Sequence, residues 1–397
     1  MPAWTGNFKA GRCGLLLAVL LAACQNKPQP EQLPPQPFVL RSLELRQRDP
    51  QGRLLWEISS PETRYDLSRR LAQARQLRGV IYQKGRPLYR LSASTAVVIN
   101  DGELVQLEGP TRLERLDKER PAVITALRVR WYPKQERMEI DRSPQAVQGD
   151  LQLTAGLARF LLDSERLELH QQPLLVQRGD QPLRLELGSV AWWPGSGALQ
   201  ARGPVRGLRR LNSGAEQRLT APALRGNTTT QIIDLQAPVT LEAPDQQASL
   251  TGGATQLNLL DRSISSESPF QARYRQARLS GGGVSLSSST TTVTVRRGCQ
   301  LQQGGDILTA ESCRWNWTSD AVAAAGEVVV RRPAAGLETS AARLDGRLGK
   351  QGVAVFRAPG SRVRTRALVP AGSGPRPIAP VPRPRQLRTD PEPPFQL

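Results

Sequence analysis

The residue types that carry most enzyme chemistry are scarce in this chain. His170 is the only histidine among 397 residues, and the alternation of Leu167 and Leu169 puts it on the polar side of a predicted strand. One histidine and widely spaced cysteines do not supply the ligands of a usual zinc site. There is no Walker A motif, so any ATP chemistry must lie in another subunit. We therefore expect no catalytic site, no cofactor and no metal.

Cys24 is the residue for which the sequence predicts a covalent modification. Lys9 and Arg12 precede a short apolar run, residues 14–23, which is too short to span a bilayer comfortably. The run ends in Leu21-Ala22-Ala23-Cys24, which looks like a bacterial lipobox. By that resemblance, cleavage precedes Cys24 and its thiol carries diacylglycerol. The alternative is a plain signal peptide followed by a chance cysteine.

The remaining cysteines are compatible with export. Removal of residues 1–23 takes Cys13 away and leaves Cys299 and Cys313 as a pair in neighbouring predicted strands. An oxidising periplasm allows a disulfide between them. Two buried thiols are the alternative, because the choice depends on a geometry that the sequence does not give.

The chain is strongly basic. Its net charge is +19, and cleavage that removes Lys9 and Arg12 leaves about +17. A basic surface favours an anionic partner such as nucleic acid, an anionic membrane face or a phosphorylated glycolipid. The alternative is a GC-rich genome that encodes arginine for solvated strand faces. Nucleic acid is disfavoured, because the chain is predicted to be exported and no array of aromatic residues accompanies the arginines.

Apolar residues that recur at every second position could bind lipid chains. Strands of about 5–6 residues span about 17–20 Å, which is close to the length of an acyl chain. Each methylene buried there contributes about 0.8 kcal/mol. For each residue alone, ordinary core packing is the alternative. The candidate groove residues are Trp56, Ile58, Leu91, Val97, Ile99, Val105, Leu107, Leu113, Ile124, Met138, Ile140, Phe160 and Leu167, with Arg112 and Arg115 as candidate rim contacts to lipid phosphates.

The elements that would position these residues are clearest between Leu91 and Leu116. Every second residue from Leu91 to Ile99 is predicted to lie on one face of a strand. Asn100-Asp101-Gly102 has hairpin-turn chemistry, because these residues tolerate positive φ. Gly109-Pro110 interrupts the second strand, and Leu113 continues the apolar phase in a third.

The same unit recurs along the chain. Turn-like tripeptides follow one another at intervals of roughly 27–34 residues, from Leu67-Ser68-Arg69 to Gly349-Lys350-Gln351. Glycine and proline are frequent (34 and 32 residues) and aromatic residues are sparse at 5%, which suits short strands better than a helical core. Gly281-Gly282-Gly283 predicts a strand bulge. We therefore predict an all-β fold, an elongated array of about ten stacked repeats.

Short motifs follow one another in a set order over roughly residues 38–165. They are Asp49-x-x-Gly52, Trp56-x-Ile58, Val80-Ile81-Tyr82, Tyr89-x-Leu91-x-Ala93, the Asn-Asp-Gly turn, Leu107-x-Gly109 and Ile124-Thr125-Ala126. This order resembles LptC, the periplasmic component of the lipopolysaccharide export ABC transporter, and the related OstA/LptA repeats. The resemblance implies that the array is an elongated twisted β-jellyroll, partly open and with an apolar interior. It also implies that this jellyroll takes lipopolysaccharide from the transporter and passes it along similar jellyrolls toward the outer membrane.

Two features depart from that family. LptC proteins commonly keep an N-terminal transmembrane helix, which lipidation of Cys24 would replace here. They also commonly end much earlier, whereas these repeats continue to about residue 365, so the second half could extend the bridge or dock a partner. The predicted organisation is a lipoprotein signal peptide (1–23), a lipidated Pro/Gln tether (24–37), an LptC-like jellyroll (38–165), continuing repeats (166–365) and a disordered Pro/Arg tail (366–397).

Together these features predict a non-enzymatic lipopolysaccharide-transfer subunit in the periplasm. It would be lipid-anchored, to the inner membrane rather than the outer. The expected partners are lipopolysaccharide, the membrane subunits of the export ABC transporter and a periplasmic LptA-like bridge protein. The alternative is a structural envelope repeat lipoprotein or a polysaccharide-binding scaffold with a filled core.

Overall fold

The structure is a computed structural model that describes residues 38–347 and 353–367. The predicted signal peptide, Cys24, the tether and nearly all of the predicted tail lie outside the described residues. Thirty-one strands and four short 3-10 segments make up the regular structure of the described ranges. No described segment is a helix with the length and apolar character needed to cross a bilayer.

The strands form two walls, which meet along a corner. Eleven long strands cross the corner and belong to both walls. They are β5 (Leu71–Gln83), β6 (Arg86–Ile99), β7 (Leu104–Arg115), β8 (Val123–Tyr132), β17 (Ala198–Arg210), β18 (Glu216–Asn227), β23 (Ser263–Tyr274), β24 (Ala277–Ser287), β25 (Thr292–Gln303), β28 (Ala321–Arg332) and β29 (Leu337–Arg347). Some of them change neighbours at the corner, as β5 does between β4 (Glu62–Asp66) and β3 (Leu54–Ser60), whereas others, such as β6 and β7, pair with each other along both walls.

The shorter strands belong to one wall each. Those of the first wall are β2 (Leu43–Arg48), β3 (Leu54–Ser60), β10 (Gln145–Gln148), β11 (Leu151–Thr154), β14 (Leu174–Gln177), β15 (Leu183–Glu186), β20 (Val239–Ala243), β21 (Ala248–Gly252), β26 (Asp306–Ala310) and β31 (Arg364–Ala367). Those of the second wall are β1 (Phe38–Leu40), β4 (Glu62–Asp66), β9 (Arg137–Arg142), β12 (Leu157–Leu161), β13 (Arg166–His170), β16 (Ser189–Trp192), β19 (Ile232–Leu235), β22 (Thr255–Asn258), β27 (Ser312–Asn316) and β30 (Ala354–Arg357).

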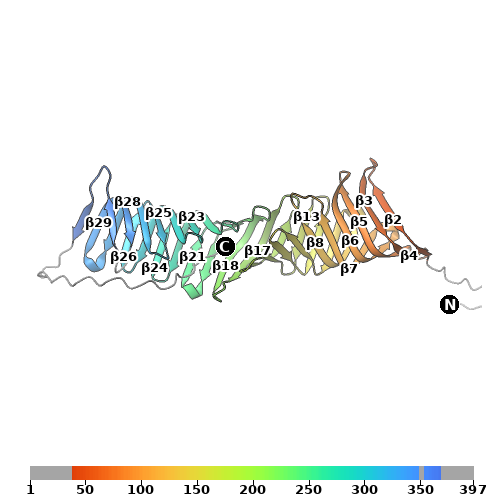
Figure 1. The fold of residues 1–397 in the computed structure, drawn as a ribbon, viewed down its shortest axis with the longest axis horizontal. Coiled ribbons are helices and arrows are strands. Elements are labelled where there is room, and N and C mark those ends of the chain that lie inside the picture. The colour runs from red at the N-terminus through yellow and green to blue at the C-terminus, as the bar shows by residue number, and fades with distance from the viewer. Residues whose placement is uncertain (1–37, 348–352, 368–397) are drawn as a thin grey trace, which may run out of the picture. The chain divides into compact units, whose positions relative to one another are not determined.

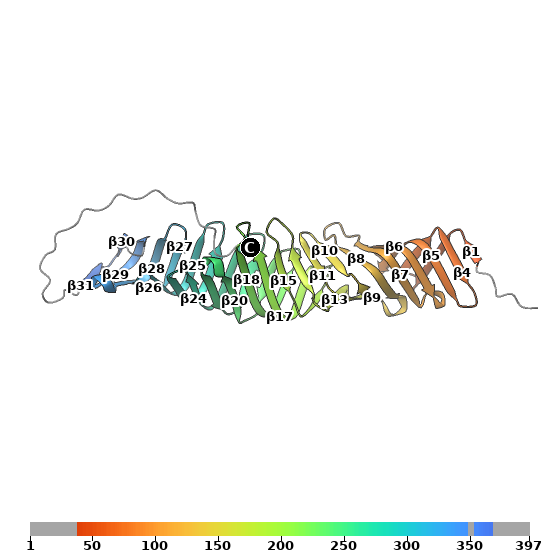
Figure 2. The same ribbon diagram turned by 90° about the horizontal axis from the view of Figure 1, so that it is seen from below.

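The strand pairings of the described residues are all antiparallel and join strands that are close in the sequence, so the colours in Figures 1 and 2 follow one another without mixing. The predicted turns from residues 67–69 to 318–320 all connect strands of the second wall. The tenth predicted turn, residues 349–351, lies outside the described residues. Two predicted boundaries, at residues 165 and 365, can be compared with the strands. Residue 165 lies inside the hairpin of β12 and β13, so strand pairing continues across it. The last described strand, β31, extends to Ala367. These features give an all-β jellyroll of stacked repeats, as predicted.

The long strands cross the corner through β-bulges. In β7, Gly109 adopts φ +77°, and the pairing with β6 shifts by one residue there. A bulge adds one residue to one strand, which bends the strand and reverses the side to which later side chains point. The prediction that Gly109-Pro110 ends a strand is therefore wrong, because β7 continues through it. Positive-φ glycines lie at corresponding places in β17, β24, β25 and β28, at Gly203, Gly283, Gly298 and Gly326.

The interior lies between the two walls. Trp56 of the first wall meets Trp131 of the second with ring centroids 5.4 Å apart, and Tyr274 meets Trp315 at 6.0 Å. One register row of inward-facing residues runs along the first wall from β3 to β28, each residue opposite the next. The row is Ile58, Gly79, Leu91, Leu113, Ile124, Ala146, Leu153, Leu175, Leu185, Gly207, Leu219, Leu241, Leu250, Ala272, Leu279, Leu301, Leu308 and Val330.

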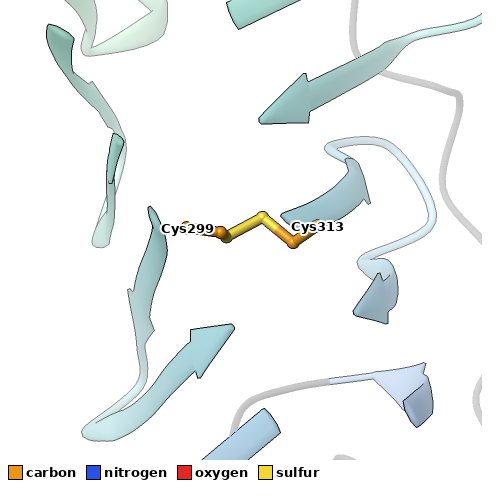
Figure 3. Close-up of a disulfide and its surroundings, with 2 residues drawn as sticks. All are labelled: Cys299 and Cys313. Carbon is orange, nitrogen blue, oxygen red and sulfur yellow. A yellow bond between two sulfur atoms is a disulfide. The ribbon is translucent and has the colours of Figure 1, made fainter. Parts of the chain in front are cut away.

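Cys299 and Cys313 form a disulfide (Figure 3), which resolves the alternative that the sequence left open. Cys299 lies in the first-wall half of β25, directly after Gly298, and Cys313 lies in β27 of the second wall. Their Cα atoms are 5.8 Å apart. The bond therefore joins the two walls close to the corner.

Candidate functional site

The two walls are joined differently along their two sides. On the corner side, long strands run from one wall into the other. On the opposite side, hairpin turns of the first wall face hairpin turns of the second, and only side chains reach across. We call this side the open edge. Because no described strand crosses it, the walls can separate there at the cost of side-chain contacts alone.

Hydrogen bonds tie the turns together at intervals along the open edge. The Gln83 amide donates to the Asp163 carbonyl at 3.2 Å, and the Gln303 amide donates to the Asp320 carboxylate at 3.0 Å. Between these two ties, Gln148 donates to the Pro194 carbonyl at 3.2 Å and accepts from the Thr228 hydroxyl. Each tie joins a first-wall residue to a second-wall turn. These ties hold the open edge closed over much of the chain.

A largely buried ion pair forms a further tie near the first repeats. Glu165, in a second-wall turn, accepts from Arg115 Nε at 3.1 Å and from the Tyr89 hydroxyl at 2.8 Å. Arg115 also donates to Asp117 at 2.5 Å, and its side chain is only 8% exposed. Tyr89 and Arg115 face each other on β6 and β7, so one carboxylate connects two first-wall strands to the second wall.

Burial and hydrogen bonding shift the pKa values of Tyr89, Arg115 and Asp117 in this cluster. Burial raises the pKa of Tyr89 far above its ordinary value, and the negative charge of Glu165 adds to that effect. Although burial alone would lower the pKa of Arg115, its hydrogen bonds to Asp117 and Glu165 raise it overall. The hydrogen bond from Arg115 lowers the pKa of Asp117. At neutral pH the group therefore holds a neutral tyrosine and a charged arginine between carboxylates.

An apolar cleft of about 460 Å³ opens beside this ion pair, and we call it the edge cleft. Turn residues of both walls form its rim, where Arg53 and Lys84 are basic and Asp49, Glu136 and Asp163 are acidic. Its floor is aromatic, since Trp56, Trp131 and Tyr89 are each at least nine-tenths buried. The apolar and aromatic residues that line it are Leu55, Trp56, Ile81, Tyr82, Leu88, Tyr89, Trp131, Pro133 and Leu162.

Two indole N–H groups at the floor of the edge cleft are unpaired. Nε1 of Trp56 and Nε1 of Trp131 are buried and have no hydrogen-bond partner among the described residues. Buried tryptophans usually find an acceptor, because an unpaired donor in an apolar site costs free energy. The edge cleft thus combines an apolar lining with two donors available to a ligand oxygen.

A second recess lies between the walls in the later repeats. Tyr274 and Leu250 of the first wall and Trp315 and Trp317 of the second line it, but its volume is only about 30 Å³. The indole N–H groups of Trp315 and Trp317 are also unpaired within the described part of the chain. Side chains nearly fill the interior there.

Eleven of the thirteen predicted groove residues are buried inside, and Trp56 among them also lines the edge cleft. Val97 and Ile99 are only half-buried, because the register shift between Ala93 and Thr95 turns Ala96 and Val98 inward in their place. The predicted single face from Leu91 to Ile99 is therefore wrong beyond the bulge. The buried eleven are Trp56, Ile58, Leu91, Val105, Leu107, Leu113, Ile124, Met138, Ile140, Phe160 and Leu167.

The two arginines predicted at the rim are placed differently by the structure. Arg112 is exposed on the outer face of the first wall, 3.6 Å from Glu114. Arg115 lies at the open edge, but its contacts with Glu165 and Asp117 occupy it. No sequence pattern pointed to Glu165, because its partners Arg115 and Tyr89 are 50 and 76 residues away in the chain. Trp131, in contrast, could have been predicted from the sequence as an interior residue, because it lies two positions after Val129 and continues the alternation of buried residues in β8.

Residues 11–173 match the sequence profile of the family described as lipopolysaccharide-assembly, LptC-related. This part of the chain is therefore similar to LptC-related proteins. The edge cleft and the Arg115–Glu165 pair both lie within this LptC-related range.

Several solved structures are similar to this chain. One of them is LptH of Pseudomonas aeruginosa, the LptA homologous periplasmic component of the conserved lipopolysaccharide transport device. The match has 15% sequence identity and a TM-score of 0.25, and it covers 29% of this chain and 82% of that one. A search of curated proteins found no match. In the described ranges, His, Cys, Asp and Glu side chains form no group that could hold a metal ion.

Proposed function

We propose that this chain is a non-enzymatic periplasmic subunit that binds the acyl chains of lipopolysaccharide between its two walls and passes them from an ABC transporter toward the outer membrane. The edge cleft is the observation that carries this proposal. It lies in the LptC-related residues and its lining is largely apolar. Its residues Trp56, Ile81 and Tyr89 each lie two positions along their strands from a member of the inward-facing row.

The interior favours an acyl chain on energetic grounds. Each methylene moved from water into an apolar environment contributes about 0.8 kcal/mol. A chain that moved along the inward-facing row would keep most of this energy at every step, so no covalent step is needed. Because side chains fill the interior, lipid must part the walls, and the open edge is the side where only side-chain contacts resist.

The polar groups of the edge cleft suit the head of such a lipid. Acyl chains of glycolipids begin at ester or amide carbonyls, and the unpaired indole N–H groups of Trp56 and Trp131 can donate to a carbonyl oxygen. Lys84 is exposed at the rim and can attract a phosphate. Both features orient a lipid with its chains inward.

The predicted lipid anchor and the two ends of the strand array suit attachment to the membrane and to partner proteins. Lipidation of Cys24 would hold the chain at the inner membrane, next to the transporter's membrane subunits. The strands at either end expose apolar residues, Phe38 and Val39 in β1 and Val355 in β30. Exposed strand edges accept further strands, so these ends suit docking to the transporter on one side and to an LptA-like protein on the other.

Photo-crosslinking tests the proposal. A photoreactive amino acid at Leu88, which lines the edge cleft, should capture lipopolysaccharide in cells. The same amino acid at Val97, which is also half-buried but points away from the interior, is the matched control. Equal capture at both positions, or none at Leu88, would reject the proposal.

A filled scaffold is the second candidate function, and the small volume of the second recess favours it. In that case the walls never part, and the chain serves as a structural lipoprotein or binds polysaccharide on its surface. Depletion would then leave lipopolysaccharide transport unchanged, whereas the first proposal requires that lipopolysaccharide accumulate at the inner membrane.

A further inference from the structure

A polar recess lies on the outer face of the first wall, far along the chain from the edge cleft. Its volume is about 440 Å³, within the range of about 300–1,000 Å³ typical of ligand pockets. It is built on β21, β23, β24 and β25, outside the LptC-related residues. None of its lining residues is acidic. We call it the outer recess.

Arg273 and Arg278 lie directly opposite each other in the outer recess, on β23 and β24. Side chains in such positions have Cβ atoms about 4.5–5.5 Å apart, and like charges there repel and destabilise the sheet. Within the described residues, the salt bridges include neither arginine. A comparable opposed pair, Arg128 and Arg142, differs because Asp141 binds Arg128 through two hydrogen bonds.

Neutral hydrogen-bonding side chains surround the two arginines in register. Ser249 is opposite Arg273 on one side, and Gln302 is opposite Arg278 on the other. The next row in register is Thr251, Gln271, Ser280 and Gln300. Hydroxyl and amide groups both donate and accept hydrogen bonds, as sugar hydroxyls do. The small side chains of Ser249 and Ser280 between longer neighbours give the recess its depth.

We propose that the outer recess binds an anionic carbohydrate. A phosphate or carboxylate group of the sugar lies between the guanidinium groups of Arg273 and Arg278 and removes their repulsion through charge-assisted hydrogen bonds. The glutamine, serine and threonine side chains bind the sugar hydroxyls. A nucleic acid fits less well, because the recess has no aromatic side chain on which bases could stack. This inference does not depend on acyl-chain binding at the edge cleft.

Calorimetry with the full chain tests the inference. The probes are trehalose 6-phosphate, digalacturonate, unmodified trehalose and inorganic phosphate. We expect one or both anionic disaccharides to bind more tightly than trehalose and than phosphate alone. The double variant R273Q/R278Q should weaken that binding by roughly tenfold or more, since it removes two charged donors. The double variant R184Q/R206Q removes the same charge from the outer face of the same wall and should leave binding unchanged.

A second variant separates binding from folding. Arg278→Glu turns the repulsive pair into an attractive one, so it should raise the melting temperature while it abolishes binding. The inference is overturned if neither anionic disaccharide binds the wild-type chain or if R273Q/R278Q binds as the wild type does. Phosphate alone, or a single-stranded oligonucleotide, binding as tightly as the disaccharides would overturn it as well. These variants should leave lipopolysaccharide crosslinking at Leu88 unchanged. A negative result for carbohydrate binding can therefore be told apart from a negative result for the lipid proposal.

Discussion

At the scale of single residues, the open edge depends on a few polar contacts. Glu165 accepts from both Tyr89 and Arg115, and the arginine is almost fully buried. A buried charge that loses a partner keeps the cost of its desolvation. This contact therefore has more influence on the edge than the exposed ion pairs of the outer faces, which contribute little.

Glu165→Gln should lower the free energy of unfolding by about 1–3 kcal/mol, because Arg115 loses one charged partner. Urea denaturation measures this change. If the pair also controls access to the edge cleft, the variant should capture lipopolysaccharide faster at Leu88. Glu338→Gln removes an exposed partner of Arg331 and serves as the control, with no measurable change expected. Equal effects of the two substitutions would show that the Arg115–Glu165 pair does not hold the edge.

At the scale of elements, the bulges decide which side chains reach the interior. Gly109 is the clearest example, since its positive φ lets β7 continue from one wall to the other. The opposing strand β6 changes phase at the same corner, and this change moves Ala96 and Val98 inward and Val97 outward. The apolar faces of two flat strands thereby become one continuous curved interior.

Gly109→Val should destabilise the chain by about 1–3 kcal/mol, because a β-branched residue is strained at φ +77°. Its Cβ would also lie 3.1 Å from Cβ of Ser94, which is a tight contact. Gly109→Asn should cost less, since asparagine tolerates positive φ. Urea denaturation of both variants checks the order, and a Gly109→Val variant as stable as the wild type would mean that the bulge relaxes freely.

At the scale of the whole molecule, each strand contacts only strands near it in the sequence. Such arrays unfold locally, because stability is a sum of repeat and neighbour contributions. The disulfide between Cys299 and Cys313 should therefore act on its own neighbourhood. It closes a short loop between the two walls in the later repeats, far along the chain from the edge cleft.

Replacement of both cysteines by alanine should destabilise the repeats around β25 and β27 by about 3 kcal/mol, the loop-closure entropy expected for a loop of this length. Hydrogen exchange should become faster in β23 to β28, while exchange in β3 to β7 stays the same. Crosslinking at Leu88 should also be unchanged. Faster exchange throughout the described strands would show that the repeats unfold as one cooperative unit instead.

Much of the fold followed from the sequence alone. Alternating apolar residues and a regular spacing of turns are local properties, so they predicted a stacked all-β array and its second-wall turns, and the family resemblance added that the array is a jellyroll. The family resemblance rested on the order of short motifs, such as Trp56-x-Ile58, and the LptC-related match confirmed it.

Tertiary structure decided the details of the site. One added residue at a bulge reverses the phase of a strand, which is why Val97 and Ile99 were placed on the wrong face. Contacts across the open edge, such as Arg115 with Glu165, depend on how two walls are staggered and not on local spacing. The same is true of the opposed arginines in the outer recess, which only the register of β23 with β24 brings together. Alternation is set by the chain itself, but pairing across a fold is set by packing.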